Sequence, residues 1–250
     1  VTIKVFSGNQ EPNNKLSLLV GFVGLAAACI AVVYTAAGNK IQVFSGALVF
    51  DNLSVYSNLA AILISGLTLF ISYDNVNTRG TSFAEHVFLV LMSLVGIMIL
   101  VSANDLMVSF VGLELMSIAL YILIGIGHEQ QLSKEAAFKY FILGSFASAV
   151  FLYGIAFLFG MTGTTNVAAL SAHTQILGAQ NQLYMIGLVL LMAGIAFKVS
   201  IFPFHAWTPD VYQGAPTSIS AFMATGVKLA MFSLFLRLAE NGLFAADHRF

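Results

Sequence analysis

Residues 183–213 read LYMIGLVLLMAGIAFKVSIFPFHAWTPDVYQ, and this stretch decides the fold class. As one helix it would measure about 46 Å, which exceeds the roughly 30 Å hydrocarbon core of a bilayer. It also contains Pro203, which has no N–H to donate to the carbonyl of Val199 and whose ring clashes there. The stretch therefore predicts a membrane helix that breaks near Pro203, and such breaks are tolerated where the backbone lines a cavity.

The composition of the whole chain agrees with a lipid environment. Of its 250 residues, 59% are hydrophobic and only 8% are charged, whereas soluble domains carry roughly 25% charged residues. The net charge of −1 and the absence of a basic run exclude a nucleic-acid partner. The single cysteine, Cys29, lies in an apolar run and can supply neither an internal disulfide nor a cluster of metal ligands. No phosphate-binding or HExxH motif occurs either.

Seven apolar segments are long enough to be membrane spans, and short polar links join them. No segment shows the strict apolar/polar alternation of a barrel strand. The segments are Leu16–Ala37, Ala47–Ile71, Val87–Ser102, Leu106–Ile126, Ala136–Gly160, Leu183–Gln213 and Pro216–Leu236. The sequence thus predicts an all-α polytopic membrane protein, a bundle of about seven transmembrane helices with one broken at Pro203. Residues 1–15 and 239–250 are polar end segments, and a start at valine leads us to expect a fragment of a longer chain.

Three charged residues fall near the middle of predicted spans. Glu114 lies in VGLELMSIAL, where an isolated charge costs about 3 kcal/mol on insertion scales. It is either a titrating carboxylate or a neutral one that hydrogen-bonds within the bundle. Lys198 lies five residues before Pro203, and freed carbonyls near Val199 could solvate its ammonium; the alternative is a lysine that snorkels to the interface. Lys228 lies in the last span, from which snorkelling is a long reach.

Such buried groups suit proton transfer. Burial disfavours the charged form of a lysine, so a buried amine can exchange protons near neutral pH, and a nearby carboxylate tunes that exchange. His205 follows the predicted break and could relay protons, although a loop histidine is often only a hydrogen-bond donor. Lys139 lies one turn into its helix, where snorkelling is at least as plausible as a functional role.

The same residues carry a family resemblance. The stretch FKVSIFPFHAWTPDVYQGAPTSISAFMATGVKLAMF closely resembles the core of the antiporter-like membrane subunits of respiratory complex I, and its FHAWTPDVYQGAPT wording resembles subunit N rather than L or M. VGLELMSIALYIL and EAAFKYFILGSFASAVFLYG resemble the preceding helices. The resemblance implies that residues 84–238 form the first five-helix antiporter-like repeat, preceded by two leading helices in residues 16–73. The family's first helix and second repeat have no counterpart here.

The resemblance also implies roles for individual residues. Glu114 is similar to the family's glutamate on the fifth helix, Lys198 to the lysine on the broken seventh helix, and Lys228 to the lysine on the eighth. Lys139 and His205 fall in matching motifs and become candidate pathway residues. These five residues are the predicted proton-translocation set.

The expected function is therefore proton translocation by buried lysine and glutamate side chains and water, within a respiratory NADH:quinone oxidoreductase. Its flavin and iron–sulfur clusters are expected on partner subunits, and no cofactor or metal on this chain. The expected partners are other membrane-arm subunits and the lipid bilayer, with no small-molecule substrate beyond protons and water. We expect a multi-pass protein of a bacterial inner membrane rather than an organellar one.

Three alternatives remain at this point. A multi-subunit cation/proton antiporter would use the same fold without NADH chemistry. A seven-helix retinal protein would explain a lysine in the last span, but not a second buried lysine at Lys198 or a proline break in the sixth helix. A structural scaffold would leave three mid-span charges unexplained.

Overall fold

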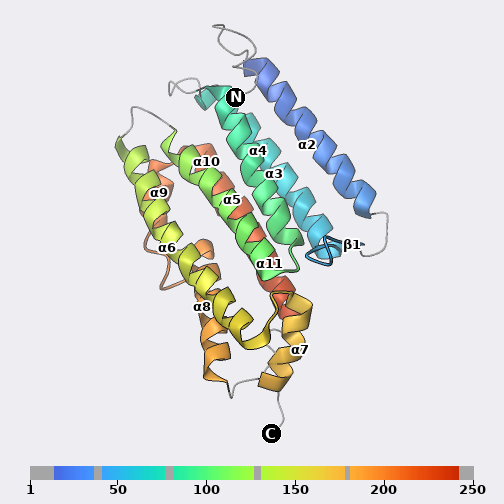
Figure 1. Ribbon diagram of the computed structural model, residues 1–250. Coiled ribbons are helices and arrows are strands. Elements are labelled where there is room, and N and C mark those ends of the chain that lie inside the picture. Colours follow the sequence, from blue (N-terminus) through green and yellow to red (C-terminus); the bar gives the residue numbers. More distant parts are fainter. Residues whose placement is uncertain (1–13, 37–40, 77–81, 127–130, 178–180, 242–250) are drawn as a thin grey trace.

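The computed structural model describes residues 14–36, 41–76, 82–126, 131–177 and 181–241. These residues form a bundle of long helices with one small hairpin at the side (Figure 1). Seven helical segments are long and apolar enough to cross a membrane, which confirms the predicted fold class. Most of the predicted polar ends, residues 1–13 and 242–250, lie outside the described residues.

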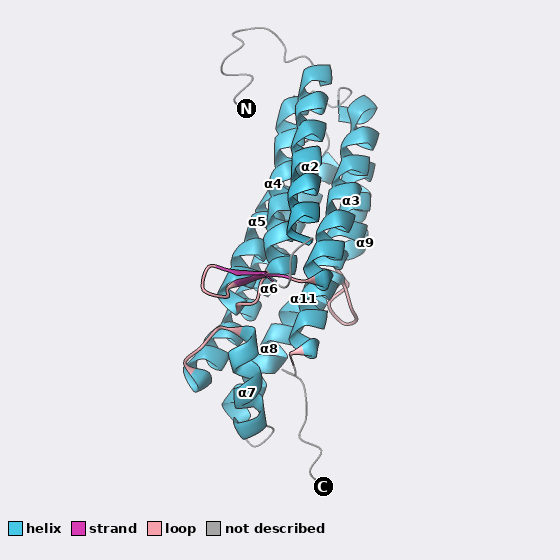
Figure 2. Cartoon of the chain, turned by 90° about the vertical axis from the view of Figure 1, so that its right-hand side faces the viewer, coloured by secondary structure: helices cyan, strands magenta, loops and turns pink. Residues whose placement is uncertain are grey.

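The long helices form a staggered bundle, in which α8 lies lower in the view than α2, α3 and α4 (Figure 2). The closest associations are those of α4 with α5, α6 with α8 and α5 with α6, while α2 and α3 cover the other side of α4. The spanning helices, in chain order, are α2 (Asn14–Ala36), α3 (Asn52–Val76), α4 (Phe83–Ser102), α5 (Leu106–Gly125), α6 (Gln131–Thr162) and α8 (Gln182–Val199), followed by α10 (Thr217–Phe222), one π-helical turn η3 (Met223–Val227) and α11 (Lys228–Glu240), which together make the seventh.

The predicted start of the second span at Ala47 is wrong. Strands β1 (Ile41–Val43) and β2 (Leu48–Phe50) pair as an antiparallel hairpin instead. Helix α3 begins only after Asp51, because Asp51 and Ser54 form a reciprocal N-terminal cap: Ser54 N donates to Asp51 Oδ1 at 3.0 Å and Asp51 N donates to Ser54 Oγ at 2.9 Å. Strand β2 of the hairpin packs against α3 and α4 at the side of the bundle.

Part of the polar link between the fifth and sixth predicted spans, residues 161–182, is helical. It contains α7 (Val167–Leu177), whose first turn is capped by Asn166, since the Asn166 Oδ1 atom accepts from Ala169 N at 3.1 Å. Val167 and Leu170 are fully buried. The burial of Val167 and Leu170 and the Asn166 cap thus stabilise a short helix in a segment that is too polar to span a membrane.

The predicted break in residues 183–213 is confirmed, but it begins before the proline. Helix α8 ends at Val199, and Ser200 adopts a left-handed conformation with φ of 64°. Turns follow until α9 (Thr208–Gly214). The break therefore starts three residues before Pro203, which stops the helix from resuming.

Glycines bring the helices around the break into close contact. A Cβ atom added to Gly96 on α4 would lie 2.4 Å from the backbone nitrogen of Met116 on α5. One added to Gly154 on α6 would lie 2.5 Å from the nitrogen of Leu191 on α8. Both crossings require glycine, because any side chain would collide with backbone atoms of the facing helix. Helices α4 and α5 are thereby held together, as are α6 and α8.

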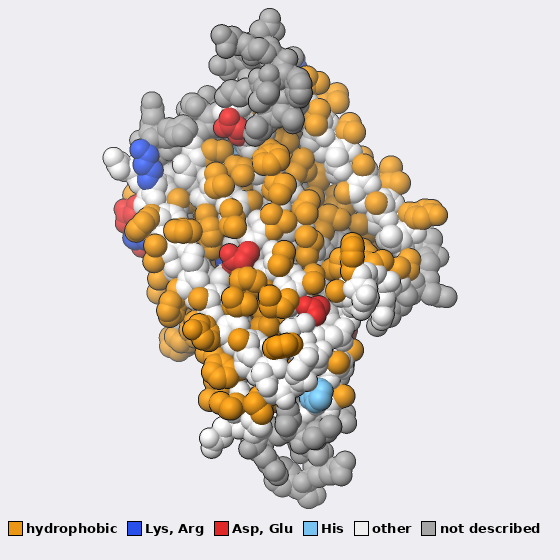
Figure 3. Space-filling view, in the orientation of Figure 1, with side chains coloured by type: hydrophobic (Ala, Val, Ile, Leu, Met, Phe, Trp, Pro, Cys, Tyr) orange, Lys and Arg blue, Asp and Glu red, His pale blue; other side chains and the backbone are white. Residues whose placement is uncertain are grey.

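Hydrophobic side chains cover most of the visible face of the bundle, and charged side chains are sparse there (Figure 3). Many large apolar residues of α2, α3, α5 and α6 are exposed on the isolated chain, among them Val23, Leu63 and Phe146. A surface of this kind needs lipid or another membrane protein around it.

Candidate functional site

Lys198 is the penultimate residue of α8 and is only 2% exposed. Its amine does not turn to the freed carbonyls of its own helix, as the sequence had suggested. The carbonyl of Ala196 accepts from Ile201 N at 2.9 Å, and that of Phe197 accepts from Trp207 Nε1 at 3.3 Å. The end of the broken helix is thus capped by the loop that follows it, and Lys198 reaches across to α5.

The partners of the Lys198 amine are hydroxyl groups on α5. Nζ donates to Ser117 Oγ at 2.8 Å and to Tyr121 Oη at 3.5 Å. The Ser117 hydroxyl gives its own proton to the carbonyl of Leu113 at 2.6 Å, so its oxygen presents only lone pairs to the amine. A buried lysine head group is therefore held by neutral acceptors.

Two aromatic rings enclose the same amine. Nζ lies 5.6 Å from the ring centre of Tyr121 and 5.5 Å from that of Tyr140 on α6, which are cation–π distances. Trp207, from the loop after the break, stacks on Tyr140 at 4.9 Å and on Phe197 at 5.4 Å. The loop between α8 and α9 thus covers the Lys198 site through Trp207, which stacks on the two neighbouring rings.

Glu114 lies on α5 three residues before Ser117, which places both side chains on neighbouring positions of one helix face. Its carboxylate is within electrostatic range of the Lys198 amine. No ion pair joins the two residues, however, and the buried Glu114 Oε1 has no hydrogen-bond partner in the described part of the chain. The structure thus brings Glu114 and Lys198 together without pairing them.

Lys228 occupies a different place in the bundle. It is the first residue of α11, directly after η3, and it is half-buried. Single π-helical turns inside a helix are uncommon and occur often at functional sites. Over the described ranges no hydrogen bond or ion pair links Lys228 to Lys198, so the structure does not join these two lysines directly.

Lys139 and His205 lie outside the group of buried side chains that surrounds the Lys198 amine. Lys139 is 38% exposed and forms ion pairs with Glu135 and with Asp210 of α9, each at 2.7 Å. His205 is exposed in the loop after α8, with its ring 5.6 Å from that of Phe202. Lys139 therefore ties α6 to α9, and His205 lies on the surface.

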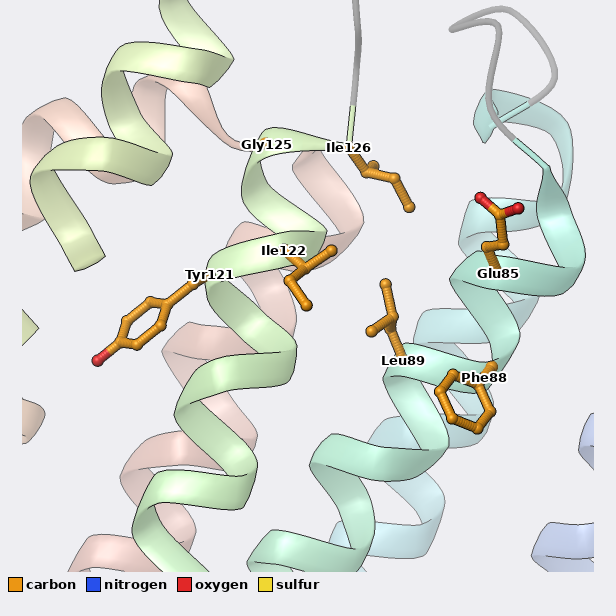
Figure 4. Close-up of a pocket in the computed structure, with 7 residues that line it drawn as sticks. All are labelled: Glu85, Phe88, Leu89, Tyr121, Ile122, Gly125 and Ile126. Carbon is orange, nitrogen blue, oxygen red and sulfur yellow. The ribbon is translucent and has the colours of Figure 1, made fainter. Parts of the chain in front are cut away.

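A groove of about 530 Å³ runs between α4 and α5 next to this site. Tyr121 lines it, yet Figure 4 shows the Tyr121 hydroxyl pointing away from α4 and from the groove. Glu85 is the acidic residue among its lining side chains, and Phe88 and Ile122 are apolar and exposed. The groove and the Lys198 site thus lie on opposite sides of one tyrosine.

Sequence analysis did not identify the contacts of Ser117, Tyr121 and Tyr140 with the Lys198 amine. A signal existed for two of them. Ser117 and Tyr121 follow Glu114 at three and seven residues, so a helical α5 puts all three on one face. Tyr140 lies on another helix, and nothing in its local sequence relates it to Lys198.

The family model described as NADH:quinone oxidoreductase/Mrp antiporter, TM, matches residues 103–245. This range contains α5, α6, α8, the broken-helix loop and α11, and therefore all five predicted site residues. The chain belongs to this family. The retinal-protein alternative therefore has no support.

Individual relatives agree with the family match. The chain is 46% identical to NADH-quinone oxidoreductase subunit N of Bdellovibrio bacteriovorus over 251 aligned positions, which cover 100% of this chain and 51% of that protein. It also resembles a chain of respiratory complex I from Thermus thermophilus, with a TM-score of 0.75 and 36% identity over 90% of this chain and 48% of that one. A chain of the Mrp complex from Dietzia sp. shares the fold, with a TM-score of 0.77 at 23% identity over 92% of this chain and 45% of that one.

The chain spans about half the length of the relatives it matches. The part that the family model matches runs from before α5 to beyond α11. Helix α8, its break and the buried Lys198 all lie inside the matched range.

Proposed function

We propose that this chain is part of a proton-translocating membrane subunit of a respiratory NADH:quinone oxidoreductase. The observation that carries the proposal is the Lys198 amine, which is buried inside a membrane bundle beside Glu114 and bonded to Ser117. An ionisable group inside a membrane is costly and usually serves transport. Relatives named NADH-quinone oxidoreductase subunit N support the choice of complex.

In the proposed step, Lys198 Nζ takes up and releases one proton. Its charge depends on its neighbours because little water reaches it, so a carboxylate nearby favours the ammonium and a neutral surrounding favours release. Glu114 supplies the carboxylate, and the hydroxyl of Ser117 supplies a neutral acceptor. A proton moves when the balance between these two surroundings changes.

The backbone around the site supports the same proposal. Helix α8 stops at Val199, beside Lys198, and η3 stops just before Lys228. Irregular backbone at membrane depth is tolerated where it adjoins a cavity or an ion path. Both proposed proton carriers thus lie next to a departure from regular α-helix, and Lys228 would be the second carrier.

The remaining roles belong to other subunits in this proposal. Redox chemistry would take place on a flavin and iron–sulfur clusters of partner subunits, and the neighbours of this chain would be other membrane-arm subunits. A cation/proton antiporter of the Mrp type is the second candidate, since it shares the fold. Greater sequence similarity to subunit N favours the first.

The test is proton pumping by membrane vesicles that carry the complex with the full-length protein. Lys198→Ala should abolish most coupled pumping while the complex remains assembled, because no nearby residue replaces the amine. Lys134→Ala, at an exposed lysine near the start of α6, is the matched control and should pump normally. Electron transfer and the proton gradient are followed together. Normal pumping by assembled Lys198→Ala complexes would show the proposal to be wrong.

A further inference from the structure

One face of α5 offers the Lys198 amine two kinds of acceptor, hydroxyl groups and the Glu114 carboxylate, and in the described structure the amine bonds to the hydroxyl groups. Nζ bonds to Ser117 Oγ at 2.8 Å, although the carboxylate of Glu114 is within electrostatic range one turn away. A carboxylate is ordinarily the stronger acceptor for an ammonium. Other contacts in the bundle must therefore hold the Lys198 amine at the Ser117 hydroxyl rather than at the Glu114 carboxylate.

The surroundings of the hydroxyl position provide that preference. The Ser117 oxygen is oriented by its own bond to Leu113, and the rings of Tyr121 and Tyr140 flank the amine. Gly144 on α6 makes room for Tyr121, since a Cβ atom there would lie 2.4 Å from the Tyr121 hydroxyl oxygen. Helices α5 and α6 thus form one preformed seat for the amine of α8, which we call the hydroxyl seat (Ser117, Tyr121 and Tyr140).

We propose that Ser117 is a positioning residue that holds the Lys198 amine in the hydroxyl seat, away from Glu114, in the state from which the proton is released. The inference rests on the proposed function, because it assigns a release state to the same lysine. In the alternative state the amine pairs with Glu114, whose Oε1 is buried without a partner among the residues described. Movement between the two acceptors covers one turn of α5.

The groups that face the amine are few. Glu114 and Tyr121 face it from α5, and Tyr140 faces it from α6. Helix α11 also packs against α8 and carries Lys228 and Arg237, but within the described residues neither forms a hydrogen bond or ion pair with Lys198. Glu114 is therefore the acidic competitor for the amine.

Loss of a hydrogen bond to a charged group changes an equilibrium by roughly tenfold or more. Ser117→Ala should therefore leave the amine at Glu114 more often and make proton release slower. In vesicles that carry the complex with the full-length protein, we expect about tenfold lower coupled turnover at neutral pH. Because a lower proton concentration restores release, the pH profile should move to higher pH by about one unit.

Three further variants make the test specific. Ser117→Thr keeps the hydroxyl and should restore the wild-type profile. Ser109→Ala is the matched control, because Ser109 is a buried serine on α5 whose hydroxyl donates to the Asp105 carbonyl at 2.9 Å. Tyr121→Phe keeps the ring and removes the weaker 3.5 Å bond, so it should give a smaller shift in the same direction.

An unshifted pH profile in Ser117→Ala, whether turnover is normal or uniformly low, would overturn the inference. If that variant fails to assemble, the profile of Tyr121→Phe decides in the same way. Lys198→Ala in the same vesicles separates the two proposals. Should it abolish pumping while Ser117→Ala leaves the profile in place, only the hydroxyl seat is wrong; should it pump normally, the proposed function itself fails.

Discussion

The ion pair between Asp51 and Arg237 offers the sharpest test of what holds this bundle together. Arg237, near the end of α11, is 4% exposed and donates to both carboxylate oxygens of Asp51, at 2.7 Å and 3.0 Å. Its Nη2 also donates to the carbonyl of Val101 at 3.0 Å. One guanidinium therefore links the starting turn of α3 with the ends of α4 and α11. The perturbation is Asp51→Ala.

The magnitude follows from what the variant leaves behind. Removing one partner of a buried ion pair costs about 3–5 kcal/mol, because the other charge stays buried and uncompensated. Asp51 is 24% exposed, so the lower end, about 3 kcal/mol, applies. Burial raises the pKa of Asp51, but the hydrogen bonds from Arg237 and Ser54 outweigh it and hold the pKa below 3.8, its ordinary value. The carboxylate is thus charged at neutral pH.

The assay is SDS-induced unfolding of the full-length protein in mixed micelles, with helix content followed by circular dichroism. Asp51→Ala should lower the free energy of unfolding by about 3 kcal/mol, whereas Glu240→Ala, at an exposed acid of the same helix α11, should change it by less than about 0.5 kcal/mol. Adding Arg237→Met to Asp51→Ala should recover most of the loss, since no unpaired charge then stays buried. Equal free energies of unfolding for Asp51→Ala and wild type would refute this reasoning. A double variant that is less stable than either single variant would refute it too.

Two further predictions use the same SDS-induced unfolding assay. As pH falls, the contribution of Asp51 to the free energy of unfolding should stay constant above pH 3.8, the ordinary pKa of the group, and decline below it. The reason is that a group whose pKa is depressed by folding stabilises the protein only while it is ionised. Asp51→Asn should lack this decline at acid pH, and an identical decline in that variant would show that other groups cause it. Gly96→Ala should cost about 2 kcal/mol or more, because its methyl group would lie 2.4 Å from the Met116 nitrogen. Gly24→Ala, with open space around the added atom, should cost nothing, and equal effects of the two glycine variants would contradict the packing argument.

The sequence could predict the helical spans because a membrane helix depends on the composition of one continuous segment. It could not predict the hairpin at residues 41–50, since those residues are as apolar as the helix after them and only the Asp51–Ser54 cap separates the two. Helix α7 was missed for a related reason. Its stability comes from burying Val167 and Leu170 under other parts of the chain, which composition does not report.

The sequence by itself determined that Glu114, Lys198 and Lys228 lie within spans and that α8 breaks near Pro203, because span length, charge and proline geometry are local properties. Only the tertiary structure decided what each charge contacts. It places Lys198 against Ser117 and between two tyrosine rings, leaves Glu114 unpaired beside it, and separates Lys139 from both through its ion pair with Asp210. Those choices depend on how the helices cross. The crossings are set by close backbone contacts, that of Gly96 between α4 and α5 and that of Gly154 between α6 and α8.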